Sequence, residues 1–289
     1  MTEERTLEEV RPAVFAVAYR MLGTVSEAEE VGQESLLRLH EALAGGERIA
    51  SPRAYAVTVA SRLAIDELRS ARARREVYVG EWMPEPLLED PGAGPAAQAE
   101  LADSLSLAFL LVLERLTPEQ RGAFLLHDVF DYDYPELARI LGVREDNARQ
   151  LASRARRLVR EQQPRFEASS EQHEALADHF FAAVQDGNLE GLEALLAGEV
   201  ELHADGGGKV PAIARPLVGR ARVARALAAW SRLGEKIGGL RIERVEVNGQ
   251  PGARAVDRDG ELISVIALEI AGGEVRALRS IVNPEKLGH

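Results

Sequence analysis

Polar side chains between residues 144 and 160 have the composition of a surface that reads double-stranded DNA. They lie on a predicted helix, opposite the apolar residues Ala148, Leu151 and Ala155. Arginine can donate two hydrogen bonds to guanine, asparagine and glutamine can pair with adenine, and serine or further arginines can hold phosphates. The candidate DNA-contacting residues are Asn147, Arg149, Gln150, Ser153, Arg154 and Arg157.

The chain before this face is predicted to form the first half of a helix-turn-helix. A short helix begins at Pro135 and carries Leu137 and Ile140, and Gly142-Val143 then turns the chain. The next helix starts near Glu145, and in helix-turn-helix units this second helix lies in the major groove. The pattern favours DNA reading, and a solvated arginine-rich helix face is the alternative.

A second basic cluster lies on a helix predicted from residue 52 to about residue 75. Ser51 is placed to cap this helix, and Tyr55, Val59, Leu63 and Leu68 are expected to be buried. The arginines project elsewhere and suit phosphate binding better than base contacts. The candidate phosphate ligands are Arg69, Arg72, Arg74 and Arg75.

Two capping boxes mark the starts of further helices. Ser26 with Glu29 is predicted to cap one helix, and Thr117 with Gln120 is predicted to cap another. The helix after Ser26 has an apolar stripe and an acidic face, so the first part of the chain is predicted to be a small helical bundle.

Four prolines and three glycines lie within residues 80–95, and this proline-rich composition excludes a regular helix there. Residues 82–87 nevertheless include a tryptophan and are too apolar for a pure spacer, so this segment is predicted to dock elsewhere on the protein. A flexible joint is the alternative.

Beyond about residue 170 the pattern becomes that of an α+β domain. Helices are predicted over residues 173–185 and 189–196, and strands dominate afterwards. Gly272-Gly273 predicts a two-residue hairpin turn, and residues 248–252 predict a longer turn.

The composition of the whole chain excludes several classes of protein. With 47 acidic and 35 basic residues among 289, the net charge is −12, so only local clusters can attract nucleic acid. The absence of cysteine excludes disulfides, thiolate metal sites and thiol nucleophiles. The N-terminus is charged, and no segment approaches the ~20 apolar residues of a membrane span. We therefore expect a cytoplasmic protein that uses no metal and no cofactor.

The helical part of the chain resembles the extracytoplasmic-function sigma factors of bacterial RNA polymerase. Residues 26–34 look like the family's polymerase-docking segment, residues 51–69 like its promoter-melting helix, and residues 116–121 with the helix-turn-helix like its minus-35-reading domain. The resemblance implies that core RNA polymerase and promoter DNA are the partners. It also implies that Glu30, Gln33 and Glu34 contact the polymerase.

Three further segments, residues 82–87, 205–209 and 283–287, are similar to signatures of the SigJ-like group, which carries a fused SnoaL-like C-terminal domain. The resemblance implies that this domain regulates the sigma factor in cis. The glycine triplet allows close approach of a neighbour, and Lys209 suits pairing with acids of the helical part. The implied interdomain residues are Trp82, Pro84, Glu85, Pro86, Leu87, Asp205, Gly206, Gly207, Gly208, Lys209, Asn283, Pro284, Lys286 and Leu287.

The expected fold class is multidomain: two all-α helical domains, the second a helix-turn-helix, followed by an α+β cone-shaped SnoaL-like domain. The expected boundaries are residues 1–79 for polymerase docking and the minus-10 element, 80–100 for the linker, 101–163 for the minus-35 element and 170–289 for regulation.

Two other functions remain open. The chain could be a DNA-binding transcriptional regulator that senses a small ligand in a C-terminal pocket. The C-terminal domain could instead be a cyclase or isomerase, with His203 and Asp205 as a base and its orienting group. Because no second acid, metal cluster or phosphate loop accompanies this pair, we expect no enzymatic activity.

Overall fold

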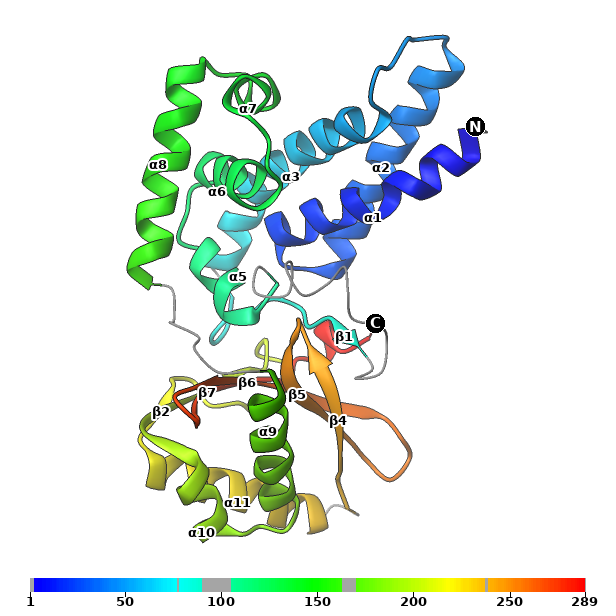
Figure 1. Cartoon of the computed structure of the whole chain (residues 1–289). Helices are drawn as coiled ribbons and strands as arrows, with labels where there is room; N and C mark the ends of the chain where they lie inside the picture. The colour runs from blue at the N-terminus through cyan, green and yellow to red at the C-terminus, as the bar shows by residue number, and fades with distance from the viewer. Residues whose placement is uncertain (1–2, 77, 90–104, 163–169, 237–238, 289) are drawn as a thin grey trace. The chain divides into compact units, whose positions relative to one another are not determined.

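The structure is a computed structural model that describes residues 3–76, 78–89, 105–162, 170–236 and 239–288. The chain forms two compact units. The first consists of residues 1–77 and 109–163, and the second consists of residues 78–108 and 164–289. The first unit is helical and the second contains a β-sheet (Figure 1). The described part of the predicted linker therefore belongs to the same unit as the C-terminal domain.

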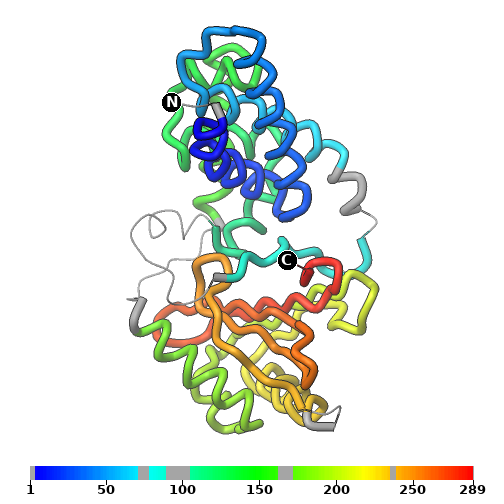
Figure 2. Tube along the Cα trace, turned by 90° about the vertical axis from the view of Figure 1, so that its right-hand side faces the viewer, coloured from blue at the N-terminus to red at the C-terminus, as the bar shows by residue number. Residues whose placement is uncertain are grey.

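The first unit begins with a bundle of three helices, α1 (Glu3–Leu22), α2 (Val25–Ala44) and α3 (Pro52–Glu76), whose path Figure 2 follows from the N-terminus. The prediction of which residues of α3 are buried is wrong in part. Tyr55, Val59 and Leu63 are only half-buried, whereas Val57 and Ala64 are buried with Leu68 as predicted. Because α3 contacts α1 and α2 as well as α6 and α7, small side chains occupy its closest approaches.

The start of α2 also differs from the prediction. Gly23 adopts a φ of 76° and turns the chain, and Thr24 is the N-cap residue. The Thr24 hydroxyl donates to the Glu27 carboxylate at 2.6 Å. Since the helix already begins at Val25, Ser26 lies inside the first turn and forms no capping box with Glu29.

In the residues that the structure describes, the second helical part comprises four α-helices and one π-helical turn. The Thr117–Gln120 capping box is confirmed, with the Gln120 amide donating to the Thr117 hydroxyl at 3.2 Å. The elements are α5 (Leu107–Leu113), α6 (Pro118–Phe124), η1 (Leu125–Val129), α7 (Tyr134–Leu141) and α8 (Glu145–Gln162).

Helices α7 and α8 form the predicted helix-turn-helix. Asp133 caps α7 in a capping box with Glu136, and Gly142 ends the helix in the left-handed conformation, with φ 67°. Ala148, Ala152, Ala155 and Val159 of α8 are buried, whereas Leu151, which was predicted to lie on the apolar face, is only half-buried. The sequence between residues 133 and 145 thus fixes where the exposed face of α8 begins.

The second unit is built on a mixed sheet with strand order β1-β4-β5-β6-β7-β2-β3. β2 runs parallel to β7, and the other neighbours are antiparallel. The strands are β1 (Leu88–Glu89), β2 (Leu196–Asp205), β3 (Leu217–Val218), β4 (Arg241–Val247), β5 (Gln250–Val256), β6 (Leu262–Ala271) and β7 (Glu274–Ile281).

Each face of the sheet buries its own apolar cluster. One face packs against α9 (Ser170–Gln185), α10 (Leu189–Leu195) and α11 (Arg220–Lys236) around Phe180 and Leu268 (Figure 1). The other face buries Met83 of the proline-rich segment beside Val265. Alternate residues of β6 serve the two clusters, as a strand requires. The predicted fold class, two helical domains followed by an α+β domain, is confirmed.

Two details of the sheet domain differ from the prediction. The turn predicted over residues 248–252 is only Asn248-Gly249, because β5 already starts at Gln250. Gly252 lies inside that strand, where a Cβ atom would be 2.6 Å from the Ile266 carbonyl oxygen. The 17-residue helix α11 interrupts the segment in which strands were predicted to dominate. The Gly272-Gly273 hairpin turn is present, with positive φ at both residues.

Candidate nucleic-acid interface and the Asp205 cluster

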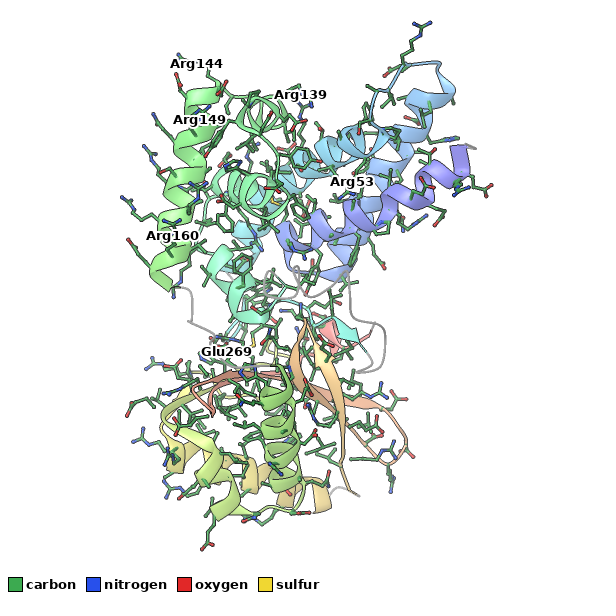
Figure 3. All side chains as sticks on the ribbon, viewed as in Figure 1. Arg53, Arg139, Arg144, Arg149, Arg160 and Glu269 are labelled. Atoms are coloured by element: carbon green, nitrogen blue, oxygen red, sulfur yellow. The ribbon has the colours of Figure 1, made fainter. Side chains whose placement is uncertain are left out.

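The six candidate DNA-contacting side chains of α8 are all exposed. Figure 3 shows Arg144 just before the start of this helix and Arg149 and Arg160 at successive levels along it. Arg149 is held in place, because it pairs with Glu145 and its guanidinium lies 4.2 Å from the centre of the Tyr134 ring. The arrangement presents amide, hydroxyl and guanidinium groups outward along one helix, as groove recognition requires.

Arg156 has a different role from its neighbours. It makes two hydrogen bonds to the Asp128 carboxylate, at 2.7 and 3.1 Å, and this contact raises the pKa of its guanidinium. The pair fixes α8 to η1. A shallow concavity of about 350 Å³ lies alongside, lined by Ser153, Arg156, Arg157, Arg160 and Glu161. Sequence reasoning missed Asp128 because nothing in the local pattern marks its partner.

Arg69 of α3 is engaged within the protein. Its guanidinium donates to the Glu119 carboxylate at 2.7 and 3.2 Å and to Asp66 at 2.7 Å. The hydrogen bond that Arg69 donates to Glu119 raises the pKa of Arg69. Burial by itself would raise the pKa of Glu119, but Arg69 outweighs it and lowers that pKa. The side chains of Arg72, Arg74 and Arg75 lie outside the described residues.

On α2, Glu30 and Gln33 are exposed, and Glu34 pairs with Arg38 at 2.8 Å. Leu37, on the same part of the helix, exposes half of its surface. Gly32 is buried 3.9 Å from Val14 of α1, measured from an ideal Cβ, so it serves helix packing. This face therefore combines acidic and amide groups with one exposed apolar side chain, a combination that suits contact with another protein.

The carboxylate of Asp205 at the end of β2 is completely buried and accepts four hydrogen bonds. The donors are the Tyr78 hydroxyl at 2.6 Å, the backbone amides of Met83 at 2.9 Å and Gly207 at 3.0 Å, and the Lys286 ammonium at 2.7 Å. Lys286 is also buried, and it lies 4.6 Å from the Trp82 ring centre and 5.0 Å from that of Tyr78. The structure thus brings together members of all three signature segments.

The glycine triplet and Asn283 complete this cluster. Gly207 and Gly208 both have positive φ. A Cβ atom on Gly207 would lie 2.4 Å from the Asn283 side chain, and one on Gly208 would lie 2.9 Å from Val79. Asn283 donates to the Tyr78 hydroxyl oxygen at 2.9 Å. A Cβ atom on Gly206 would lie 2.6 Å from the Val210 carbonyl oxygen, so each glycine admits a close neighbour.

The remaining signature residues extend the cluster along the proline-rich segment. Pro84, Glu85 and Pro86 are buried, and the Leu87 amide donates to the Asn248 side chain at 2.9 Å. Pro284 is exposed and begins the short 3-10 helix η2 (Pro284–Lys286), and Leu287 packs beside Met83. We call residues 78–88, together with Asp205, Asn283 and Lys286, the linker latch.

One expectation for the latch is wrong. Lys209 pairs with Glu285 of the C-terminal segment at 2.8 Å, rather than with acids of the helical part. The turn formed by the glycine triplet directs this exposed lysine to the neighbouring end of the sheet domain. The sequence analysis did not place Tyr78 in this cluster, although a tyrosine just before a signature segment was a usable signal.

His203 and Asp205 do not form the base and orienting pair of an enzyme site. His203 Nδ1 lies 2.8 Å from Glu81 of the proline-rich segment, and Nε2 lies 3.0 Å from Glu201. The oxygens of Asp205 are occupied by latch donors. Burial lowers the pKa of His203, but the hydrogen bonds to the two glutamates more than compensate, so the pKa is raised. Within the described ranges no cluster of three or more histidine, aspartate or glutamate side chains could hold a metal ion.

Comparisons with known proteins match both parts of the chain. Residues 6–74 match the family model "Sigma-70 region 2" and residues 106–159 match "Sigma-70, region 4". The chain is 38% identical to the ECF RNA polymerase sigma factor SigJ of Mycobacterium tuberculosis, over 98% of this chain and 93% of that protein. It is 32% identical to the probable ECF RNA polymerase sigma factor SigI of the same species, over 96% and 92%. The crystal structure of the M. tuberculosis SigJ protein superposes with a TM-score of 0.76 at 34% identity, covering 96% of each chain.

Proposed function

This chain belongs to the family of extracytoplasmic-function RNA polymerase sigma factors, and we propose that it acts as a promoter-specificity subunit that binds core RNA polymerase. The observation that carries the proposal is the exposed row of side chains on α8, which follows a well-capped helix-turn-helix. The polymerase makes the RNA, and this chain supplies recognition. Its proposed place of action is the cytoplasm. None of the described helices is long and apolar enough to cross a membrane.

In this proposal the two helical parts have separate tasks. The α2 surface around Glu30, Gln33 and Glu34 contacts the polymerase, and α3 contacts the minus-10 region through its arginines. Helix α8 enters the major groove at the minus-35 element and contacts bases through Asn147 and Gln150. The exposure of these side chains and their chemistry support the assignment.

Run-off transcription with core polymerase tests the proposal, with DNA from upstream of the protein's own gene as template. The Asn147→Ala, Gln150→Ala double variant should lower transcript yield strongly, because two base-reading amides are lost. A control variant, Arg232→Ala, changes an exposed residue of α11 and should transcribe like the unchanged chain. Tight sequence-specific binding to DNA without any dependence on polymerase would instead favour a ligand-sensing regulator.

We also propose that the C-terminal domain regulates initiation in cis through the linker latch. The latch holds residues 78–88, and these residues precede the second helical part in sequence. The length of chain that is free to connect the two promoter-binding parts therefore depends on whether the latch holds residues 78–88. A chain lacking residues 170–289 should direct transcription with altered yield, and identical yield would contradict regulation in cis.

A further inference from the structure

Asn248, the first residue of the turn between β4 and β5, contacts the chain on both sides of residues 88–104. Its side-chain oxygen accepts from the Leu87 amide at 2.9 Å, and its backbone amide donates to the Leu87 carbonyl oxygen at 2.9 Å. Its side-chain nitrogen donates to the Leu105 carbonyl oxygen at 3.0 Å. Leu87 and Leu105 lie 161 and 143 residues away from Asn248 in sequence, so folding of the sheet domain brings the three together. We call these three hydrogen bonds the Asn248 clamp.

The carboxamide of Asn248 has two different partners, and each partner fits only one of its polar atoms. A backbone amide can only donate and a backbone carbonyl can only accept, so the oxygen must face Leu87 and the nitrogen must face Leu105. Asn248 is 2% exposed, and a buried amide of this kind is tolerated because its polar atoms are hydrogen-bonded. An ionised aspartate has nearly the same shape but lacks the donor for Leu105. The clamp therefore depends on asparagine itself.

The turn alone does not explain these contacts. Asn248 and Gly249 both have positive φ, 53° and 72°, which is the two-residue hairpin geometry that asparagine and glycine adopt readily. This geometry needs no hydrogen bond from the Asn248 side chain to a distant segment, and glycine at position 248 would satisfy it equally well. The side chain of Asn248 therefore has a task that is separate from the turn.

Apolar side chains beside the clamp hold the same two stretches of chain. Met83 and Leu107, one on each side of residues 88–104, are both buried in one cluster with Val247, the residue before Asn248. The short strand β1 adds backbone pairing to β4. The sheet domain thus gathers both stretches on one face, and the clamp supplies the polar contact that fixes where they meet.

We propose that Asn248 is a positioning residue that anchors the far end of the linker, at Leu105, to the same point of the sheet domain as the near end, at Leu87. The linker latch holds only residues 78–88, so the clamp is a second and separate attachment. With the clamp closed, residues 88–104 add nothing to the length of chain that connects the two helical parts, because they begin and end at one residue. The role of the clamp in transcription rests on the proposed regulation in cis, whereas the attachment itself does not.

Hydrogen–deuterium exchange of the full free chain tests the attachment. In Asn248→Asp, one carboxylate oxygen still accepts from the Leu87 amide, but the other faces the Leu105 carbonyl oxygen, so only the far end loses its bond. Exchange of residues 105–113 should become roughly two- to tenfold faster, the equivalent of one lost hydrogen bond, while exchange of residues 83–89 stays the same. In Asn248→Gly, which keeps the turn, both stretches should exchange faster.

Asn188→Asp is the matched control for this measurement. It makes the same chemical change in the same unit, at the exposed N-cap of α10, where aspartate and asparagine are equally good caps. Neither stretch should change its exchange rate in this variant. Equal rates for residues 105–113 in the Asn248 and Asn188 variants would refute the attachment. Faster exchange spread over the whole sheet domain would also refute it, because Asn248 would then support the fold rather than the far end of the linker.

Run-off transcription with core polymerase tests the role of the attachment. Asn248→Gly should change the transcript yield in the same direction as removal of residues 170–289, whereas Asn188→Asp should leave the yield unchanged. An altered yield in the truncated chain together with a normal yield in Asn248→Gly would overturn the role of the clamp in regulation. If the truncated chain also gives a normal yield, the proposed regulation in cis is refuted and the clamp has no role in transcription, while the exchange rates still decide whether the attachment exists.

Discussion

The Asp205 carboxylate has no exposed surface and depends on the donors that surround it. Two of those donors, Tyr78 and the Met83 amide, belong to residues 78–88 of the latch, whereas Lys286 and the Gly207 amide belong to the later part of the chain that forms the sheet domain. The buried charge is tolerated because it is paired and fully hydrogen-bonded. Each side of the linker latch therefore depends on the other.

Replacing Lys286 with methionine should destabilise the C-terminal unit strongly. The substitution keeps most of the apolar stem but leaves the Asp205 charge buried without its counter-ion, which typically costs about 3–5 kcal/mol. Lys209→Met is the matched control, because it breaks only the exposed pair with Glu285 and should cost less than about 1 kcal/mol. Urea unfolding of the full chain measures both. Similar losses for the two variants would mean that Asp205 does not require Lys286.

His203 predicts a pH dependence of the same region. Burial and, to a smaller extent, nearby Arg279 lower the pKa of His203. The hydrogen bonds to Glu81 and Glu201 outweigh them and raise this pKa above 6.5. Arg279 is itself paired with Glu269, which Figure 3 labels. A raised pKa means that the protonated histidine stabilises the folded state below pH 6.5, and that this stability is lost as the pH rises through the folded-state pKa.

The measurement is the urea midpoint at about pH 6 and about pH 8, in the full chain and in His203→Gln. The unchanged chain should lose more stability on going to the higher pH than the variant does. The difference between the two chains in how far the urea midpoint shifts with pH isolates His203 from the other titrating groups. Equal shifts of the urea midpoint in the two chains would show that the pairing of His203 with Glu81 and Glu201 gives no net stabilisation.

At the residue scale, the sequence was informative where a side chain belongs to a recognisable signature. Asp205, Asn283, Lys286 and Trp82 were identified in this way, and the structure brings them together. One of the two hydrogen bonds from residues 78–88 to Asp205 comes from the backbone amide of Met83. A backbone donor cannot be recognised from the type of its residue. Arg69 was identified as a basic side chain, but its partner Glu119 is 50 residues away, and single-sequence reasoning has no means to pair them.

Among structural elements, the glycine turn after β2 offers a sharp test. Gly207→Ala places a methyl group where φ is 60° and where Asn283 lies 2.4 Å from the ideal Cβ position. The left-handed backbone costs roughly 1 kcal/mol for alanine, and displacing Asn283 adds the loss of its bond to Tyr78. Proteolytic cleavage within residues 78–89 should therefore become faster.

Gly198→Ala is the control for this turn. Gly198 lies in β2, has nothing within 4 Å of the ideal Cβ position and does not have positive φ. Its replacement should leave the rate of cleavage in residues 78–89 unchanged. Equal rates for the two alanine variants would show that the turn tolerates a side chain and that the triplet does not set the latch.

Element boundaries followed from sequence where local hydrogen bonding decides them. The Thr117 cap, the Gly142 end of α7 and the Gly272-Gly273 hairpin are all local, and all are present. The buried face of α3 was not predictable in the same way, because two separate helical layers pack on that helix. Ala64 is buried and Leu63 is only half-buried, because tertiary packing rather than the size of the apolar side chain decides which residue of α3 faces the core.

For the molecule as a whole, the charge distribution sets how DNA binding must respond to salt. The net charge is −12, so attraction to a polyanion has to come from local arginines. Several of those arginines are already paired within the protein, among them Arg156 with Asp128 and Arg69 with Glu119. Arg154 and Arg157 of α8 are exposed, and under the proposed function we expect them to be the main source of counter-ion release on that helix.

The salt dependence of promoter binding by the polymerase complex should therefore report on α8. If Arg154 and Arg157 each bind one phosphate, their replacement by alanine should reduce the slope of log K against log salt by about 0.9 for each contact. Asn147→Ala should instead weaken binding to the preferred sequence, by about 1–3 kcal/mol, without changing the slope, because a base contact releases no counter-ion. Arg222→Ala with Arg232→Ala removes the same two charges from α11 and should leave the slope unchanged. If the α11 pair reduces the slope as much as the α8 pair does, the acidic chain binds promoter DNA by diffuse attraction, and α8 has no special position at the groove.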